Sequence, residues 1–105
     1  MAFPSFETEW HNNKDKIREI FNKKYLPEIN NGNLKEIVIS DNHTDLRNKG
    51  LPFCTKSQYV VYEKDGEYKA GAHQYLKPDG TLGASGLPDP NRIVIQEKII
   101  AYKEN

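Results

Sequence analysis

The chain has 105 residues, of which 36% are hydrophobic and 29% are charged. This length fits one domain, so we treat residues 1–105 as a single unit with one small core. Fifteen basic and fifteen acidic residues give a net charge of zero, which removes the simplest argument for a nucleic-acid partner. The apolar runs are too short to cross a membrane, and the first residues lack the basic and apolar regions of a signal peptide.

Cys54 is the single cysteine of the chain, so no internal disulfide can form. A reducing compartment such as the cytoplasm is therefore expected. We expect the thiol to act as a small, partly buried hydrophobic group rather than as a nucleophile. No neighbour in the sequence resembles a base that would activate it.

The first predicted element is an amphipathic helix over residues 6–26. Apolar side chains recur in it at helical spacing, with charged residues between them: Phe6, Trp10, Ile17, Ile20, Phe21 and Tyr25. Ser5 can cap its N-terminus. Pro27 either stops the helix or restarts it for one turn, which residues 30–32 then end. We expect the apolar stripe to pack into the core.

Residues 36–40 are β-branched and apolar at their centre, which predicts a short strand. Residues 41–56 are polar and irregular, and a loop of this length is often functional. Asp41, His43 and Asp45 alternate within it. Their spacing matches no metal-binding motif, so we expect neither a metal site nor a cofactor.

A β-hairpin around the turn at residues 65–66, Asp-Gly, is the strongest short-range signal. A two-residue turn fixes the register, which predicts Tyr62 opposite Lys69 and Gln58 opposite His73. The pleat then sorts the side chains onto two faces. The first face is predicted to carry Gln58, Val60, Tyr62, Lys69, His73 and Tyr75, and the second Tyr59, Val61, Tyr68, Ala70, Ala72 and Gln74. We place the helix on the second face, where alanines leave room, and expect the first to stay partly open.

Residues 92–95 and 99–102 predict two further strands, joined as a hairpin or forming one long bulged strand. The predicted fold is α+β, with an N-terminal amphipathic helix packed on a four- to five-stranded, mostly antiparallel sheet.

The segment between the two groups of strands, residues 77–90, is rich in glycine and proline. Pro78 and Gly80 favour a turn that includes Asp79, and the small residues around Ser85 let the backbone approach a neighbour closely. The segment is neither a phosphate-binding loop nor a nucleophile elbow. It fits either a structural role or contact with a ligand or partner.

The predicted first face also suggests a chemistry. His73 titrates near neutral pH and can serve as an acid or a base. Lys69 and Tyr62 beside it could stabilise a phosphate, as metal-independent RNA cleavage requires. Arg92 could join them if its strand pairs with the hairpin. The alternative is an ordinary surface or interface histidine.

One stretch of the chain carries a resemblance. His73-Gln74-Tyr75-Leu76, followed by Pro78-Asp79-Gly80-Thr81-Leu82-Gly83, Ser85-Gly86 and Pro88-Asp89-Pro90, resembles a stretch found in small hypothetical proteins of bacteria and their phages. The resemblance implies a prokaryotic or phage setting and carries no activity. A helix before an antiparallel sheet is also similar to the small ribonuclease toxins of the RelE and barnase type, although those toxins are usually basic.

Two functions therefore compete. The leading prediction is a small intracellular prokaryotic or phage protein that acts as a non-catalytic protein-interaction module of inhibitor or regulatory type. Its expected binding residues are Gln58, Tyr62, His73, Tyr75, Asp79 and Ser85. The alternative is a metal-independent ribonuclease of toxin type that uses His73, Lys69, Tyr62 and Arg92 on RNA. Self-association through an exposed sheet edge is a third possibility.

Overall fold

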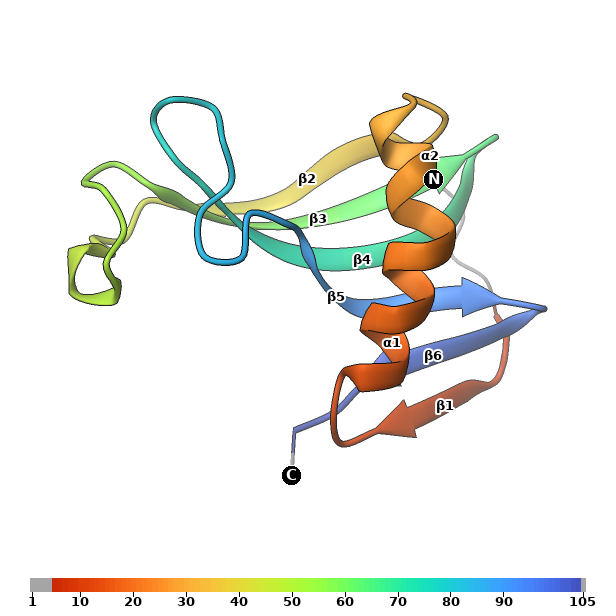
Figure 1. The fold of residues 1–105 in the computed structure, drawn as a ribbon. Coiled ribbons are helices and arrows are strands. Elements are labelled where there is room, and N and C mark those ends of the chain that lie inside the picture. The colour runs from red at the N-terminus through yellow and green to blue at the C-terminus, as the bar shows by residue number, and fades with distance from the viewer. Residues whose placement is uncertain (1–4, 105) are drawn as a thin grey trace.

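In the computed structural model of the protein, a helical segment crosses one face of a six-stranded sheet (Figure 1). The structure describes residues 5–104, so the expected lack of a signal peptide rests on residues that lie partly outside it. In sheet order the strands are β1 (Thr8–His11), β6 (Lys98–Tyr102), β5 (Asp89–Ile95), β4 (Glu67–Leu76), β3 (Lys56–Lys64) and β2 (Lys35–Asn42). Neighbouring strands are antiparallel except β1 and β6. The α+β class and the mostly antiparallel sheet are confirmed, but six strands replace the predicted four or five.

The start of the predicted helix is wrong. Residues 8–11 form the parallel edge strand β1 instead of a helical turn. The two asparagines that follow favour turns over helix, and the side chain of Asn13 accepts a hydrogen bond from the Asp15 backbone N–H at 3.1 Å. Ser5 therefore caps nothing. Trp10 points away from the core and is 55% exposed.

The helical segment begins at Asp15 and continues to Asn30. It comprises α1 (Asp15–Ile20), a π-helical turn η1 (Phe21–Tyr25) and α2 (Leu26–Asn30). Pro27 lies in the first turn of α2, where its missing N–H costs no hydrogen bond. Gly32 follows with a φ of 76°, a left-handed conformation that suits glycine. The helical segment thus continues through Pro27 without a break and ends after Asn30, as predicted.

The core lies between the helical segment and the sheet. Ile17, Phe21 and Tyr25 project from the helix at helical spacing and are buried. They pack against side chains from four strands: Val60, Tyr62, Ala70, Ala72, Ile93 and Ile100. The opposite face of the sheet holds a second, smaller cluster: Val61, Tyr68, Val94, Ile99 and Ala101. The face that we expected to be polar and open is therefore partly apolar and buried.

A β-bulge changes the predicted hairpin register. Glu63 pairs with Tyr68 as predicted, but Tyr62 then pairs with Ala70 and leaves Lys69 as the extra residue. Beyond the bulge every partner on β4 is displaced by one position, so His73 lies opposite Tyr59. Side chains alternate between the two faces of a strand. The displacement therefore puts the β4 residues predicted for the first face, such as His73, on the same face as the β3 residues predicted for the second, such as Tyr59.

The helix consequently covers a mixture of the two predicted faces. Ala70 and Ala72 of β4 lie beneath it, as we expected, but so do Val60 and Tyr62 of β3. His73 projects from the opposite face. Placing the helix over Tyr59 and Val61 was therefore wrong.

The remaining elements follow the sequence closely. β2 contains the predicted strand at residues 36–40, and the loop after it holds a 3-10 turn η2 (Arg47–Lys49). β5 and β6 form a hairpin, because Gln96 and Glu97 between them adopt positive φ values of 49° and 58°. No helix among the described residues is long and apolar enough to span a membrane.

Cys54 does not have the expected burial. Its side chain is exposed, and the residue occupies a surface turn with a φ of 70°. The turn carries the thiol out of the core, so the expectation of a partly buried hydrophobic residue is wrong.

Candidate functional site

Two hollows lie beside the glycine- and proline-rich segment. The first, the cleft, has a volume of about 430 Å³. It is bordered by Arg18 and Asn22 of the helix, residues 73–75 of β4, and residues 83–85 and 87–90. The second, called the groove below, has a volume of about 370 Å³ and lies between α2, strands β2 to β4 and residues 80–88. Both are lined by Gln74, Leu87 and Pro88, so they adjoin one another.

The local sequence explains why both hollows form here. β5 pairs with β4 only up to His73, whereas β4 continues to Leu76. Residues 77–82 turn back through Gly80, whose φ is 88°, so that Leu82 bridges Leu76. The Gly83 N–H then donates to the Tyr75 carbonyl at 2.8 Å. The following residues must leave β4 to reach β5, and this departure opens the space.

The cleft contains three of the predicted site residues: His73, Tyr75 and Ser85. His73 Nε2 lies 2.7 Å from the Ser57 hydroxyl, and its ring meets the Tyr75 ring edge-on at 4.7 Å. Burial lowers the pKa of His73 below its usual value, although Asp89 acts in the opposite direction. His73 is therefore neutral at neutral pH.

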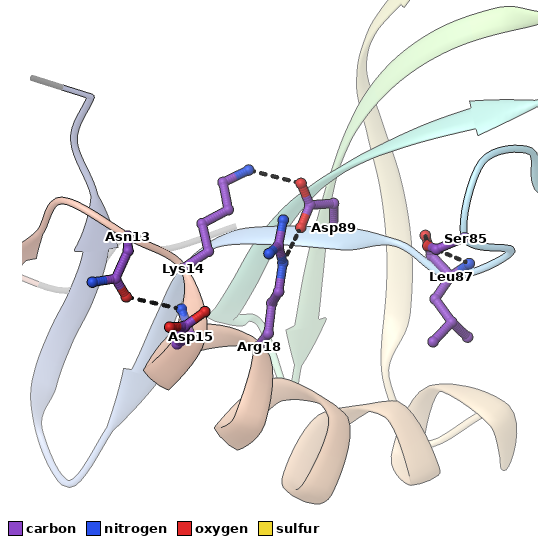
Figure 2. Close-up of polar contacts among 7 residues, drawn as sticks. All are labelled: Asn13, Lys14, Asp15, Arg18, Ser85, Leu87 and Asp89. Atoms are coloured by element: carbon purple, nitrogen blue, oxygen red, sulfur yellow. Dashed lines mark hydrogen bonds and ion pairs between the residues drawn. The ribbon is translucent and has the colours of Figure 1, made fainter.

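Asp89 lies at the mouth of the cleft and joins the sheet to the helix. Its carboxylate accepts from Lys14 at 2.8 Å and from Arg18 at 2.9 Å (Figure 2). Burial alone would raise the pKa of this carboxyl, but the hydrogen bonds from Arg18 and Lys14 outweigh it and keep the pKa below its usual range. Each carboxylate oxygen serves one of these two cations.

The Ser57–His73 contact resembles the first half of a nucleophile–base pair. Such a pair needs a third group that orients the histidine ring. Asp89 is the cross-strand neighbour of His73, but its oxygens bind Lys14 and Arg18 instead. Ser57 is also absent from the described lining of the cleft. The contact is best explained as a cross-strand hydrogen bond that orders the end of β4.

The groove contains the other buried members of the predicted site, Gln58 and Tyr62. The bulge accounts for the separation, because it turns Tyr62 beneath the helix while His73 faces the other way. Asp79 borders neither hollow; it accepts from the Thr81 backbone at 2.9 Å and from the Thr81 hydroxyl at 2.6 Å inside its own turn.

The predicted catalytic set is thus divided. Lys69 lies in the bulge, four residues or about 13 Å along the strand from His73, and its ammonium contacts Glu67 at 3.3 Å. Arg92 does lie on the His73 face, because β5 pairs with β4 and sets Arg92 opposite Gly71. Neither Lys69 nor Arg92 borders the cleft among the described residues.

Sequence reasoning missed several residues of this region. Arg18, Asn22 and Asp89 line the cleft, and Ser57 supports His73. Arg18 and Asn22 lie on the polar face of the helix. Residues that only face solvent have the same spacing, so the sequence could not mark these two as site residues. Of these residues, only Asp89 could have been suggested as a site residue from the sequence, because it lies between two prolines.

The loop after β2 holds the acidic residues and histidine that we considered as metal ligands. Asp41 lies 3.7 Å from His43, while Asp45 binds Arg47 at 2.7 Å. Within residues 5–104, no three His, Cys, Asp or Glu side chains gather closely enough to hold a metal ion.

β2 forms one edge of the sheet and is largely exposed along its length. Its central residues are apolar: Val38 is 46% exposed and Ile39 is 54% exposed. Edge strands that avoid pairing usually carry charges, proline or a bulge. β2 has one of these features, an irregularity between Val38 and Ser40, but its apolar centre carries neither a charge nor a proline, and its charges lie towards the ends.

Comparison with protein-family models, with curated proteins and with solved structures gave no match.

Proposed function

We propose that this chain is a non-catalytic protein-interaction module that associates through the outer edge of β2, with a second copy of itself as the partner. The observation that carries the proposal is the exposed apolar centre of this edge strand, Val38 and Ile39. An unpaired edge offers a row of backbone donors and acceptors to an added strand. In β2, exposed apolar side chains lie beside these backbone groups.

The charges of β2 indicate why a second copy fits. Lys35 lies at one end of the strand and Asp41 near the other. In an antiparallel pair centred on Val38, Lys35 of each copy lies opposite Asp41 of the other. Ile37 lies opposite Ile39 in the same register. Opposite charges and apolar pairs both stabilise cross-strand neighbours, and a two-fold axis uses the same strand from both copies.

The other edge of the sheet offers less. β1 has four residues and, like β2, is paired on its inner side only. A longer strand provides more backbone hydrogen bonds to a partner, so β2 with its eight residues is the better docking element.

The setting of this module comes from the sequence. The resemblance to small bacterial and phage proteins supports a prokaryotic or phage origin, and the single cysteine supports the cytoplasm. An inhibitor or regulatory role is consistent with binding without catalysis.

Sedimentation velocity over a range of protein concentrations tests the proposal. The wild type should sediment as a dimer, and Ile39→Lys should raise the dimer dissociation constant by about tenfold or more, because pairing would desolvate the added charge. Phe53→Lys is the matched control. Phe53 is apolar and 61% exposed but lies in a loop, so its substitution should leave association unchanged. A strictly monomeric wild type, or equal effects of both variants, would contradict the proposal.

Metal-independent RNA cleavage lacks comparable support, because the predicted catalytic residues are dispersed. Total RNA incubated with the protein, with or without chelator, should therefore remain intact. Cleavage that is retained with chelator and lost in His73→Ala would restore the ribonuclease alternative.

A further inference from the structure

The groove has predominantly aliphatic walls. α2 contributes Leu26 and Ile29, β2 contributes Val38, and the turn and loop after β4 contribute Leu82 and Leu87. At about 370 Å³ it has the size of a site for a small molecule. Apolar walls of this kind hold the aliphatic part of a ligand, while the polar groups at the base determine which ligand is accepted.

A buried hydroxyl without a partner lies among these lining residues. Tyr62 is fully buried, and its hydroxyl has no hydrogen-bond partner among the described residues. Tyr25, which belongs to the helical segment itself, donates a hydrogen bond from its hydroxyl to the Val94 carbonyl. A buried polar group that is left unpaired destabilises the fold. The Tyr62 hydroxyl is therefore a donor that a ligand could satisfy.

Apart from the exposed Asn30, the other polar side chains of the groove form an ordered chain. Gln74 Nε2 donates to Gln58 Oε1 at 2.9 Å and to Glu36 Oε1 at 3.1 Å. Both N–H groups of the Gln74 amide are thereby used, and the Gln58 amide nitrogen makes no hydrogen bond within the described part of the chain. The buried lining residues thus present two donors, the Tyr62 hydroxyl and the Gln58 amide.

The charge of the groove restricts the ligand further. Glu36 is the one charged side chain among the described residues that line it. Glu36 also helps to raise the pKa of Tyr62, after the larger effect of burial, so the hydroxyl stays protonated. A carboxylate ligand would be repelled by Glu36, whereas a neutral carbonyl oxygen would accept from both donors.

From these features we propose that the groove binds an uncharged aliphatic carbonyl compound, such as an aliphatic amide. Its carbonyl oxygen accepts from the Tyr62 hydroxyl and the Gln58 amide nitrogen. Its hydrocarbon chain lies against Leu26, Ile29 and Leu87. Glu36 and Val38 of β2 border this site with their side chains, whereas self-association uses the outer backbone edge of the same strand, so binding here does not require a dimer.

Titration of isotope-labelled protein with hexanamide, followed by NMR, tests this inference. The expected shifts are saturable and confined to α2, the neighbouring strands and residues 80–88. Hexanoate has the same chain but is repelled by Glu36, and hexylamine has no acceptor for the two donors, so both should bind more weakly. Tyr62→Phe should weaken hexanamide binding about five- to tenfold, the effect of one lost hydrogen bond, whereas Tyr25→Phe should not.

Three results would overturn the inference. The first is the absence of localised, saturable shifts with hexanamide. The second is tighter binding of hexanoate or hexylamine than of hexanamide. The third is equal affinity of wild type and Tyr62→Phe for hexanamide. Because the titration does not depend on oligomeric state, its failure leaves the proposed dimer untouched, and a monomeric protein leaves this inference untouched.

Discussion

Tyr25 and Tyr62 are two buried tyrosines of the same core with different hydrogen bonding. Tyr25 donates to the Val94 carbonyl, while the Tyr62 hydroxyl is unpaired among the described residues. Both rings contact Phe21, with centroid distances of 6.5 Å and 6.0 Å. The pair therefore separates the contribution of a hydroxyl from that of its aromatic ring.

The two phenylalanine variants should change stability in opposite directions. Tyr25→Phe leaves the Val94 carbonyl without this donor and should lower the free energy of unfolding by about 1–2 kcal/mol. Tyr62→Phe removes an unpaired buried hydroxyl and should raise it by about 1 kcal/mol. Urea denaturation of the ligand-free protein measures both. A clear loss of stability in Tyr62→Phe would show that its hydroxyl is satisfied, contrary to the structure.

His73 should give the fold a dependence on pH. Burial keeps the pKa of His73 below its usual value of about 6.5, so the unfolded chain binds this proton more readily than the folded chain. The contribution of neutral His73 is complete above that value and is lost as the pH falls through the pKa of the folded state. Stability should therefore decline as the pH falls below about 7.

Denaturant titrations across this range test the effect of His73. In His73→Gln the decline should become shallower, since the side chain no longer titrates. An unchanged slope in this variant would show that other groups cause the pH dependence. The carboxyl of Asp89, whose pKa is lowered, acts only at more acidic pH.

At the scale of the elements, the sequence predicted strands and turns better than the register in which the strands pair. The Asp-Gly turn at residues 65–66 correctly set the pairing of Lys64 with Glu67. Alternation along each strand was also correct locally. The bulge at Lys69 was not visible, because a lysine there suits an exposed regular strand equally well. One extra residue then moved His73 to the face opposite Tyr62.

The N-terminal helix shows the same limit. Phe6 and Trp10 fit the helical period of Ile17 and Phe21, yet residues 8–11 pair with β6. The partner strand lies some ninety residues later in the chain, so local spacing carries no information about it. The helix itself, from Asp15 onwards, was predictable because its apolar stripe and its end at Gly32 are local features.

The attachment of α1 to β5 depends on Asp89. Its carboxylate joins Lys14 and Arg18, whose side chains are 17% and 52% exposed. Asp89→Asn should lower the free energy of unfolding by about 0.5–1 kcal/mol, as for a partly exposed ion-pair network, and the loss should shrink at high salt. Asp45→Asn is the control, because Asp45 binds Arg47 within one loop. Equal losses in the two variants would contradict a joining role for Asp89.

At the scale of the whole molecule, the sheet has unequal edges and unequal faces. The helical segment covers one face, and the opposite face is closed in part by its own apolar cluster. β1 provides a short edge, and β2 a long one with apolar side chains at its centre. The candidate surfaces arise from this arrangement, since the cleft and groove join residues from the helix, the strands and the late loop. Composition and local spacing could not predict that segments so distant in the sequence lie side by side.

Disulfide cross-linking across β2 tests the central claim most directly. In a Cys54→Ser background, Lys35→Cys and Asp41→Cys variants are prepared separately and then mixed under mild oxidation. The proposed register sets position 35 of one copy opposite position 41 of the other, which brings the two Cα atoms within reach of a disulfide. The mixture should form a covalent dimer of one copy of each variant, and either variant alone should form far less. No preferential dimer in the mixture would contradict pairing of β2 with a second copy.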